Sequence, residues 1–477
     1  MTYSLYFHIP FCTHRCAYCD FNTYAGQESL IPAYVDALCR EMEFVGTRLP
    51  SRKIAPVDSK LPSRTIESVE SGLPSPLGGG AGGEGVHTIF FGGGTPSLLT
   101  PKQFEQILHT VRNLFDLSDL SDLETSLEAN PGTVTFDSLR GLRRAGFNRI
   151  SFGVQSFDPG ELRQLERIHD PFDVFNAVRW ARQAGFENMN LDLIYGLPEQ
   201  SLARWQANVK RAVELSPQHL SLYALTIEHG TPYGRWAAHG LLPLPDPDLA
   251  ADMYEWASDF LEGLGYEQYE ISNWARPGFQ CRHNLQYWRN LPYLGFGAGA
   301  HGCANGMRIS NVLHIKTYLS RLGSDHSIPT LPTTERLIPD RLIPDHLIPN
   351  CLFPLSPATV TKIPLTRFVE MQETMMLGLR LTQEGVSAQA FRQRFGQEMQ
   401  AVFGKEIDDL VGLGLLEWAA SPSPSGIVSL SSSDATISPP PSGEGPGVRV
   451  DGSGGLVRLT KRGRLLGNQA FMRFVGE

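Results

Sequence analysis

Three cysteines lie close together near the start of the chain, in the segment Tyr6-Phe-His-Ile-Pro-Phe-Cys12-Thr-His-Arg-Cys16-Ala-Tyr-Cys19-Asp-Phe. Their C-x3-C-x2-C spacing puts three thiolates on one loop, where they can bind three corners of a cubane [4Fe–4S] cluster. Such a cluster normally has four cysteine ligands, so one iron is left coordinatively unsaturated. That iron can bind a small chelating molecule, for example one that offers an amino group and a carboxylate.

Zinc is the alternative occupant of this loop, because His14 can complete a Cys3His ligand set. Structural zinc sites usually use paired C-x2-C knuckles, however, and the spacing here does not match them. The chain has 7 cysteines, and crowding three of them into one loop does not resemble a disulfide framework. In a reducing compartment such a group indicates metal binding or catalysis. The spacing therefore favours the cluster.

A glycine run follows a predicted strand, in Phe91-Gly-Gly93-Gly94-Thr95-Pro-Ser. Glycines let the backbone approach a ligand closely, although the run alone is equally typical of a tight turn. Glu128, in Leu-Glu-Ala-Asn-Pro, ends the next predicted strand, where its carboxylate can accept a hydrogen bond from a ligand.

The cysteine loop, with Tyr18 before its last cysteine, resembles that of the radical S-adenosylmethionine (SAM) superfamily. The flanking Tyr-x-His-Ile-Pro-Phe-Cys is similar to that of the oxygen-independent coproporphyrinogen III oxidases and their relatives. This resemblance spans the chain outside three insertions. It implies that SAM binds the open iron and can be cleaved by one electron to a 5′-deoxyadenosyl radical. The positions that contact SAM in the family match Tyr6, Tyr18, Gly93, Gly94, Thr95, Glu128, Gln155, Arg167, Asp192 and Ala224.

The resemblance also implies individual roles for some of these residues. The Gly-Gly-Gly-Thr-Pro segment holds the SAM amino group, and Arg167 pairs with the SAM carboxylate, for which a guanidinium fork is well shaped. Asp192 binds the ribose hydroxyls, and Ala224 approaches the adenine. Each residue taken singly is equally typical of a helix surface or a strand end. Their occurrence at consecutive strand ends favours a shared function.

Two departures separate this chain from the decarboxylating oxidases of the family. Those enzymes carry a further cysteine two residues past the last cluster ligand, where this chain has Phe21. They also carry an N-terminal extension that helps to seal the substrate site, whereas the first predicted strand here begins almost at Met1. The substitution argues against an active coproporphyrinogen III oxidase and leaves open whether the chain is an enzyme.

A second motif lies downstream, in the segment Cys281-Arg-His283-Asn284-Leu-Gln-Tyr287-Trp288. Its H-N-x-x-Y-W pattern resembles the one associated with heme in the heme-chaperone branch of the family. A neutral imidazole can ligate heme iron, and the two aromatic rings offer flat apolar surface to a porphyrin. Cys281 and His301 are alternative axial ligands. The alternative interpretation is a structural turn, in which the histidine and asparagine form hydrogen bonds and the aromatic rings belong to the core.

Two functions therefore stay open. The first is a heme chaperone that binds heme together with a SAM-ligated cluster and delivers heme to apo-hemoproteins. The second is oxidative decarboxylation of coproporphyrinogen III propionates to vinyl groups, and a weaker third is a radical SAM enzyme with another substrate. A low-potential electron donor, a homodimer and peripheral membrane association with the heme recipients are the further partners to expect.

The elements that position these residues alternate between strand and helix patterns. Six apolar strands are predicted at 5–9, 86–91, 125–128, 149–154, 188–195 and 220–225, separated by amphipathic helices. Strand–helix units in a row predict a parallel sheet with right-handed crossovers, and ligand sites of such folds lie at the carboxyl ends of the strands. We expect an α/β fold: a partial, open (βα)6 barrel over 1–235, then a mainly helical domain over 236–477 with a winged-helix-like end.

Composition narrows the remaining choices. Three Gly-, Pro- and Ser-rich segments, 51–85, 324–364 and 420–455, are predicted to be disordered or loosely held insertions. The net charge of −9 argues against nucleic acid as a partner. The chain has neither an apolar run of membrane-spanning length nor a signal-peptide pattern at its N-terminus. We therefore expect a cytoplasmic protein.

Overall fold

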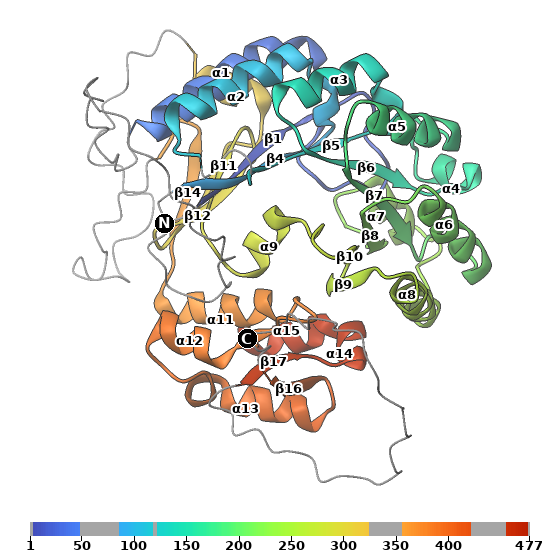
Figure 1. Ribbon diagram of the computed structural model, residues 1–477, viewed down its shortest axis with the longest axis vertical. Helices are drawn as coiled ribbons and strands as arrows, with labels where there is room; N and C mark the ends of the chain where they lie inside the picture. The colour runs from blue at the N-terminus through green and yellow to red at the C-terminus, as the bar shows by residue number, and fades with distance from the viewer. Residues whose placement is uncertain (1–2, 48–84, 118–121, 324–354, 421–454, 476–477) are drawn as a thin grey trace, which may run out of the picture. The chain divides into compact units, whose positions relative to one another are not determined.

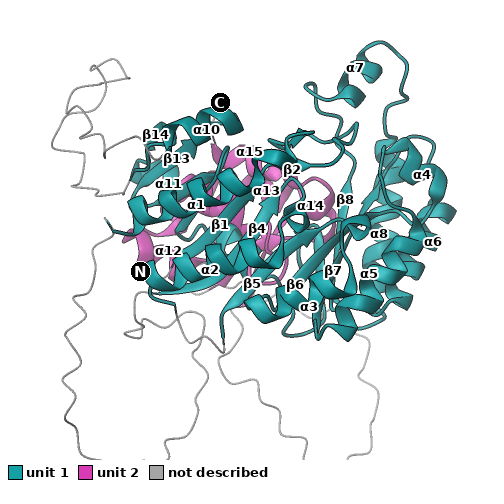
Figure 2. Ribbon diagram, turned by 90° about the horizontal axis from the view of Figure 1, so that it is seen from above, with its two compact units in different colours: residues 1–52, 83–370 teal, residues 53–82, 371–477 magenta. Residues whose placement is uncertain are grey.

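The computed structural model describes residues 3–47, 85–117, 122–323, 355–420 and 455–475. The chain forms two compact units, which Figure 2 colours separately. Of the described residues, 3–47, 85–117, 122–323 and 355–370 belong to unit 1, and 371–420 and 455–475 belong to unit 2. None of the helices in the described ranges is both long and apolar enough to cross a membrane.

Unit 1 is built on a 12-stranded sheet with the order β14-β13-β12-β11-β1-β4-β5-β6-β7-β8-β10-β9. The stretch from β1 to β8 is parallel throughout. Its strands are the predicted ones: β1 (Tyr3–Ile9), β4 (Val86–Gly93), β5 (Glu124–Ala129), β6 (Arg149–Gln155), β7 (Asn188–Tyr195) and β8 (His219–Ala224). The sheet ends at β14 and β9 and does not close, so the predicted partial, open barrel is confirmed.

Helices cover the outer face of the curved sheet, as Figure 1 shows. Capping side chains mark where several of them begin: Thr100, Thr135, Asp170 and Ser201 each accept a backbone N–H bond from the first turn. An apolar face of each helix is buried against the strands. The covering helices are α1 (Ile31–Gly46), α2 (Pro101–Leu114), α3 (Phe136–Ala145), α5 (Pro171–Gln183) and α6 (Leu202–Glu214).

Smaller elements complete unit 1. The cysteine loop contains a two-stranded parallel sheet of β2 (Phe11–Cys12) and β3 (Tyr24–Ala25). Short 3-10 helices precede or follow strands at η1 (Glu28–Leu30), η2 (Pro96–Leu98) and η3 (Pro131–Thr133). The remaining helices are α4 (Pro159–Gln164), α7 (Pro232–Ala238), α8 (Pro247–Glu262), α9 (Arg282–Trp288) and α10 (Ile315–Arg321).

The sheet continues past residue 235, where the sequence analysis expects a mainly helical domain. Both edges gain short strands: β9 (Glu267–Glu270) and β10 (Asn273–Ala275) beyond β8, and β11 (Tyr293–Phe296), β12 (His301–Ala304), β13 (Met307–Asn311) and β14 (Thr359–Pro364) beyond β1. Because these strands join the sheet of unit 1, the units divide at residue 370 rather than at residue 235.

One of these additions carried a recognisable sequence signal. Strands β12 and β13 are joined by Asn305 and Gly306, which have φ angles of 51° and 73°. Two consecutive positive φ angles in an Asn-Gly pair are typical of the tight hairpin turn that matches strand twist. Strand β14 pairs with β13 and occupies the end of the predicted insertion 324–364. Otherwise the three predicted insertions lie almost wholly outside the described residues.

Unit 2 begins within α11 (Arg367–Gly378). It continues as β15 (Val386–Ser387), α12 (Ala388–Phe395), α13 (Met399–Gly412), β16 (Leu416–Ala420), β17 (Gly455–Leu459), α14 (Lys461–Leu465) and α15 (Gly467–Val475). The three strands pair antiparallel in the order β15-β17-β16. Helix, strand, helix, helix and a two-stranded wing follow one another, which is the order of a winged helix and agrees with the predicted end of the chain.

Candidate functional site

A cavity of about 520 Å³ lies on the inner side of the curved sheet. Its walls include the three clustered cysteines, hereafter the cluster cysteines, and each residue that the resemblance implies for SAM. From the downstream motif, three residues line the same cavity: His283, Asn284 and Tyr287. The cluster cysteines and the downstream motif therefore share one site although Cys12 and His283 are 271 positions apart in the sequence.

The cysteine loop is held by contacts from Thr95, just after β4, and from Arg167, just after α4. The Thr95 hydroxyl donates to Cys12 Sγ at 3.5 Å, and Arg167 Nη1 donates to Cys16 Sγ at 3.6 Å. A backbone bond from Cys19 N to Cys16 O, 3.1 Å long, closes the turn between the last two cysteines. Burial raises the pKa of the Cys12 and Cys19 thiols. Metal binding at these sulfurs must therefore release protons.

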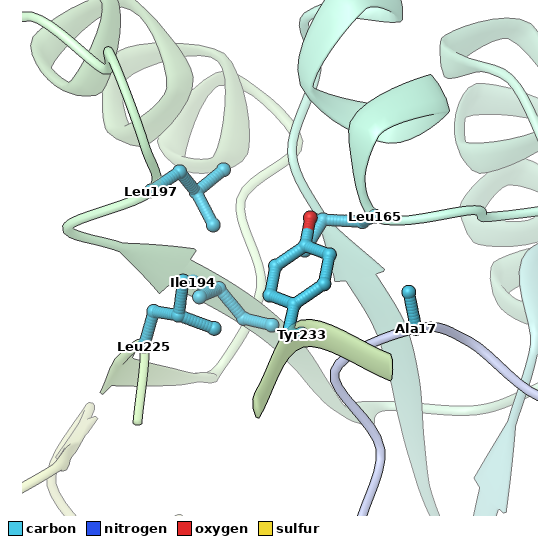
Figure 3. Close-up of a cluster of buried hydrophobic side chains, with 6 residues drawn as sticks. All are labelled: Ala17, Leu165, Ile194, Leu197, Leu225 and Tyr233. Atoms are coloured by element: carbon cyan, nitrogen blue, oxygen red, sulfur yellow. The ribbon is translucent and has the colours of Figure 1, made fainter. Parts of the chain in front are cut away.

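Apolar packing fixes the middle of this loop. Ala17, between two of the cysteines, is fully buried and meets the ring of Tyr233, as Figure 3 shows. The Tyr233 amide donates to Ala17 O at 3.1 Å, and its hydroxyl donates to Gln164 O at 2.7 Å. The rest of the small core consists of Leu165, Ile194, Leu197 and Leu225. The loop is thus anchored to the ends of β7 and β8 independently of any metal.

The glycine run is required by the close approach of β4 to the cysteine loop. A Cβ at Gly94 would lie 2.6 Å from Phe11 O and 3.1 Å from Cys12 Sγ, and real Cβ atoms do not approach backbone that closely. Gly93 has a φ of 111°, which favours glycine, and its amide donates to Glu128 Oε2 at 3.0 Å. The run therefore leaves backbone and space facing the cavity.

Two carboxylates line the cavity, Glu128 from β5 and Asp192 from β7, with β6 between the two strands. Burial, with the neighbouring Asp192 charge, raises the pKa of Glu128 to about 7. Burial also raises the pKa of Asp192, although that carboxylate accepts bonds from Asn190 Nδ2 at 2.7 Å and Ser151 Oγ at 3.0 Å. A cationic ligand would stabilise both carboxylates in their charged forms.

Two further residues of the same cavity, Gln155 and Arg167, carry buried polar atoms without a hydrogen-bond partner. The Oε1 atom of Gln155 is buried without a hydrogen-bond partner, and the residue has a φ of 68°. The Nε atom of Arg167 is likewise buried without a partner, while Nη2 donates to Gly153 O at 2.6 Å. Strain and unmet hydrogen-bonding capacity concentrate where ligands bind. This corner of the cavity has donors and acceptors available for a polar ligand.

These groups fit the cofactors that the sequence implies. Three thiols, a close backbone approach, two carboxylates and unpaired polar atoms suit a [4Fe–4S] cluster with SAM on its open iron, which together supply one-electron cleavage chemistry. The zinc alternative needs His14 as its fourth ligand. In the structure, Nε2 of His14 lies 3.4 Å from Glu166 Oε2, as a hydrogen-bond partner of that carboxylate. Within the described ranges, no three His, Cys, Asp or Glu side chains are grouped to hold a single metal ion.

The downstream motif folds as α9, which lies on the concave side of the sheet (Figure 1). The Glu124 carboxylate accepts bonds from the backbone amides of Arg282 and His283, both 3.1 Å long, and so fixes the start of the helix. His283 is 1% exposed, and its ring stacks on Phe90 with a centroid distance of 4.9 Å.

Both ring nitrogens of His283 have partners. Nδ1 lies 2.9 Å from Thr88 Oγ1, and Nε2 lies 2.9 Å from Tyr287 OH. Burial lowers the pKa of His283 to about 3, so the ring is neutral at physiological pH. Iron ligation needs a neutral ring. His283 Nε2 can bind iron, however, only after its hydrogen bond to the Tyr287 hydroxyl breaks.

The other residues considered for heme lie outside the cavity. Cys281 is fully buried with Sγ 3.7 Å from Glu124 Oε1, and burial raises the pKa of its thiol to about 12. His301 is exposed on β12, and Trp288 is half-buried at the end of α9. None of the three lines the cavity. The structure thus brings three of the four H-N-x-x-Y-W residues to the cluster cysteines.

Comparison with known proteins supports this assembly. Residues 80–212 match the radical SAM superfamily, and residues 365–421 match the HemN C-terminal domain. The heme chaperone HemW of Bacillus subtilis is 33% identical over 475 residues, which cover 99% of each chain. The heme chaperone HemW of Escherichia coli is 41% identical over 301 residues, which cover 63% of this chain and 69% of that one.

The chain belongs to the HemW family. Membership of the radical SAM superfamily implies a [4Fe–4S] cluster and SAM as cofactors. Among solved structures, the coproporphyrinogen III oxidase HemN of Escherichia coli covers 99% of this chain and is covered over 89% of its own, with a TM-score of 0.68 and 23% identity. That similarity shows the same fold.

The sequence analysis missed a second group of cavity residues, which lie on the inner face of β6, β7 and β8: Arg149, Ser151, Asn190, His219 and Ser221. These strands were predicted from their apolar residues alone, without a polar face. The signal was the alternation of polar residues with apolar ones, as in Arg149-x-Ser151-x-Gly153-x-Gln155. Since successive side chains point to opposite faces, this alternation puts a polar column on one face.

Proposed function

We propose that this chain is a heme chaperone that binds heme beside a SAM-ligated [4Fe–4S] cluster and transfers it to apo-hemoproteins. One observation carries the proposal: His283, Asn284 and Tyr287 line the same cavity as the cluster cysteines. A purely structural role for the motif would not by itself require three of its residues to line that cavity. The relatives that match over most of this chain are named heme chaperones, which agrees with the proposal.

The residue at position 21 supports the chaperone over the oxidase. Phe21 lines the cavity next to the cluster cysteines and is 64% exposed. The decarboxylating oxidases of the resembled group carry a cysteine there. A phenylalanine supplies apolar surface to a flat ligand and no thiol for chemistry. The propionate-to-vinyl conversion is therefore the less supported function.

The proposal includes several partners that follow from the chemistry. Reduction of the cluster needs a low-potential electron donor, and heme transfer needs an apo-hemoprotein that contacts the site. We place this exchange in the cytoplasm, with peripheral membrane association where the recipient is membrane-bound. A homodimer is a further part of the proposal.

The test is an anaerobic heme titration of the cluster-loaded protein, followed by the Soret band. His283→Ala should weaken a saturable, near-stoichiometric binding. His109→Ala is the matched control, because His109 is exposed on α2 and, within the part of the chain that the structure describes, bonds only to Asn113 one turn along the helix. Cys281→Ala and His301→Ala test the other two axial ligands in the same assay.

Three outcomes separate the functions. Loss of binding in His283→Ala alone would assign the ligand and support the chaperone. Loss in Cys281→Ala or His301→Ala instead would keep the chaperone and move the iron ligand. No saturable binding by the wild-type protein, together with vinyl products from coproporphyrinogen III, SAM and a reductant, would overturn the proposal in favour of the oxidase.

A further inference from the structure

Arg149 is a buried charge that faces the cavity. It is the first residue of β6, it is 2% exposed, and its side chain lines the cavity. Its Nε atom is buried without a hydrogen-bond partner, and no described residue forms an ion pair with its guanidinium. A buried, permanently charged group with unused donors is costly unless a partner arrives.

The nearby acidic groups do not neutralise this arginine by contact. Both carboxylate oxygens of Glu124 accept backbone N–H bonds from the start of α9. Asp192 is held by Asn190 and Ser151, and burial raises the pKa of its carboxyl. Burial also raises the pKa of the Cys281 thiol to about 12, so that group is neutral. Burial lowers the pKa of the Arg149 guanidinium, but surrounding groups, Glu124 and Asp192 among them, raise it above its usual value without contacting it. Its Nε keeps an unpaired N–H, and the residue lines the cavity.

Polar side chains surround Arg149 on the neighbouring strands. The register of the sheet places Ser151 beside Asn190, and Asn190 beside His219. His219 Nδ1 lies 2.7 Å from Asn190 Oδ1, and Ser221 donates to the same oxygen at 3.2 Å. The inner faces of small barrels are usually filled by apolar side chains. A polar inner face indicates that this part of the lumen receives a polar ligand group.

The polar residues around Arg149 lie away from Arg167, the predicted partner of the SAM carboxylate. Arg149 and Gln155 are the two ends of β6, so their Cα atoms are roughly 20 Å apart along the strand. Arg167, the predicted partner of the SAM carboxylate, contacts Gly153 and Cys16 near the Gln155 end. A second anion-binding position is therefore available at the opposite end of the cavity.

We infer that Arg149 binds a carboxylate of the second ligand in this cavity, and that this carboxylate is a heme propionate. The assignment of the propionate rests on the proposed heme-chaperone function. A guanidinium fork matches a carboxylate with two parallel hydrogen bonds, and such charged bonds are roughly twice as strong as neutral ones. Ser151, Asn190 and Ser221 supply neutral polar atoms beside that pair.

The experiment compares heme with heme dimethyl ester, in which both propionates are neutral. Cluster-loaded, SAM-bound protein is titrated anaerobically with each, as wild type, as Arg149→Gln and as Arg179→Gln. Arg179 is the matched control, because it is exposed on α5 and its one hydrogen bond to another described residue joins it to Asn176. Wild type and the control should bind heme at least about tenfold more tightly than the ester. Arg149→Gln should bind both ligands equally, near the affinity of wild type for the ester.

Each result has one meaning. Equal affinity of wild type for heme and its ester would overturn the inference while leaving the chaperone intact. No heme binding by wild type would overturn the proposed function itself. A fall in SAM affinity in Arg149→Gln, with the heme-to-ester ratio unchanged, would assign the carboxylate to SAM and refute the propionate. If Arg149→Gln does not fold, Arg149→Lys replaces it: a reduced preference for heme supports the inference, and an unchanged one refutes it.

Discussion

Replacing Glu128 by Gln tests whether the negative charge of this carboxylate contributes to the binding of a cationic ligand. In the ligand-free protein, burial and the Asp192 charge raise the pKa of Glu128 from 4.5 to about 7. Ionised Glu128 therefore lowers the free energy of unfolding of the ligand-free protein, and the neutral amide of Gln does not. Gln keeps an oxygen that can accept the Gly93 amide bond. The substitution therefore removes the charge and little else.

The magnitude follows from the two pKa values. Each pH unit of pKa difference corresponds to about 1.4 kcal/mol, so the rise from 4.5 to about 7 costs at most roughly 3 kcal/mol once Glu128 is ionised. Because the folded-state pKa is the higher one, the penalty is absent below pH 4.5, grows as pH rises and is complete above pH 7. Glu128→Gln should therefore melt a few degrees above wild type at pH 8, and the two proteins should melt at the same temperature near pH 4.

Binding should change in the opposite direction. A cationic ligand beside Glu128 favours the ionised carboxylate, so wild-type SAM affinity should rise with pH up to about 7 and then level. Glu128→Gln should bind SAM more weakly, and its affinity should not rise between pH 4.5 and 7 as that of the wild type does. Any pH dependence that comes from ionisation of SAM itself should remain. Equilibrium dialysis of cluster-loaded protein at several pH values measures both. Asp192→Asn should move the break in the profile to lower pH, because it removes the neighbouring charge.

Two results would refute this reasoning. Parallel pH profiles of SAM affinity in wild type and Glu128→Gln would show that the carboxylate does not face the ligand. A variant less stable than wild type at pH 8 would show that the buried charge is already compensated in the ligand-free protein.

Three further predictions concern the rest of the site. Replacing any one cluster cysteine by Ala should abolish the broad absorbance near roughly 400 nm, whereas Cys39→Ala, on α1 outside the cavity, should keep it. Arg167→Ala should weaken SAM binding about tenfold or more in equilibrium dialysis with the cluster retained, and Arg163→Ala, on the exposed side of α4, should not. Gly94→Ala should lower cluster content and cost roughly 1–3 kcal/mol in denaturant unfolding, because its Cβ meets Phe11 O at 2.6 Å, while Gly230→Ala meets nothing within 4 Å and should be neutral.

The parts of the site that the sequence predicts are those set by short spacing. The cluster cysteines occupy one loop, and the glycine run and Glu128 follow strands whose apolar pattern is clear. Their meeting in one cavity follows from parallel topology alone. Local spacing and topology were therefore enough to place most of the residues predicted for SAM.

Contacts between polar residues that are far apart in the sequence could not be predicted. His283 bonds Thr88 across 195 positions, and Glu124 fixes the start of α9 across 159 positions. Neither partner has a motif of its own. Arg149 was missed for a related reason. A strand with polar alternate positions can turn them to solvent or to an inner cavity, and only the curvature of the open sheet decides between the two.

The two interpretations of the downstream motif, heme ligand and structural turn, describe the same histidine in two states. In the structure His283 is a buried ring with both nitrogens bonded. Ligation of iron through Nε2 would break only the bond to Tyr287 and would keep the one between Nδ1 and Thr88. That second bond would then fix the tautomer with hydrogen on Nδ1, which is how ligating histidines are usually oriented. Since Tyr287 also lines the cavity, the hydroxyl released from His283 would stay beside the incoming ligand.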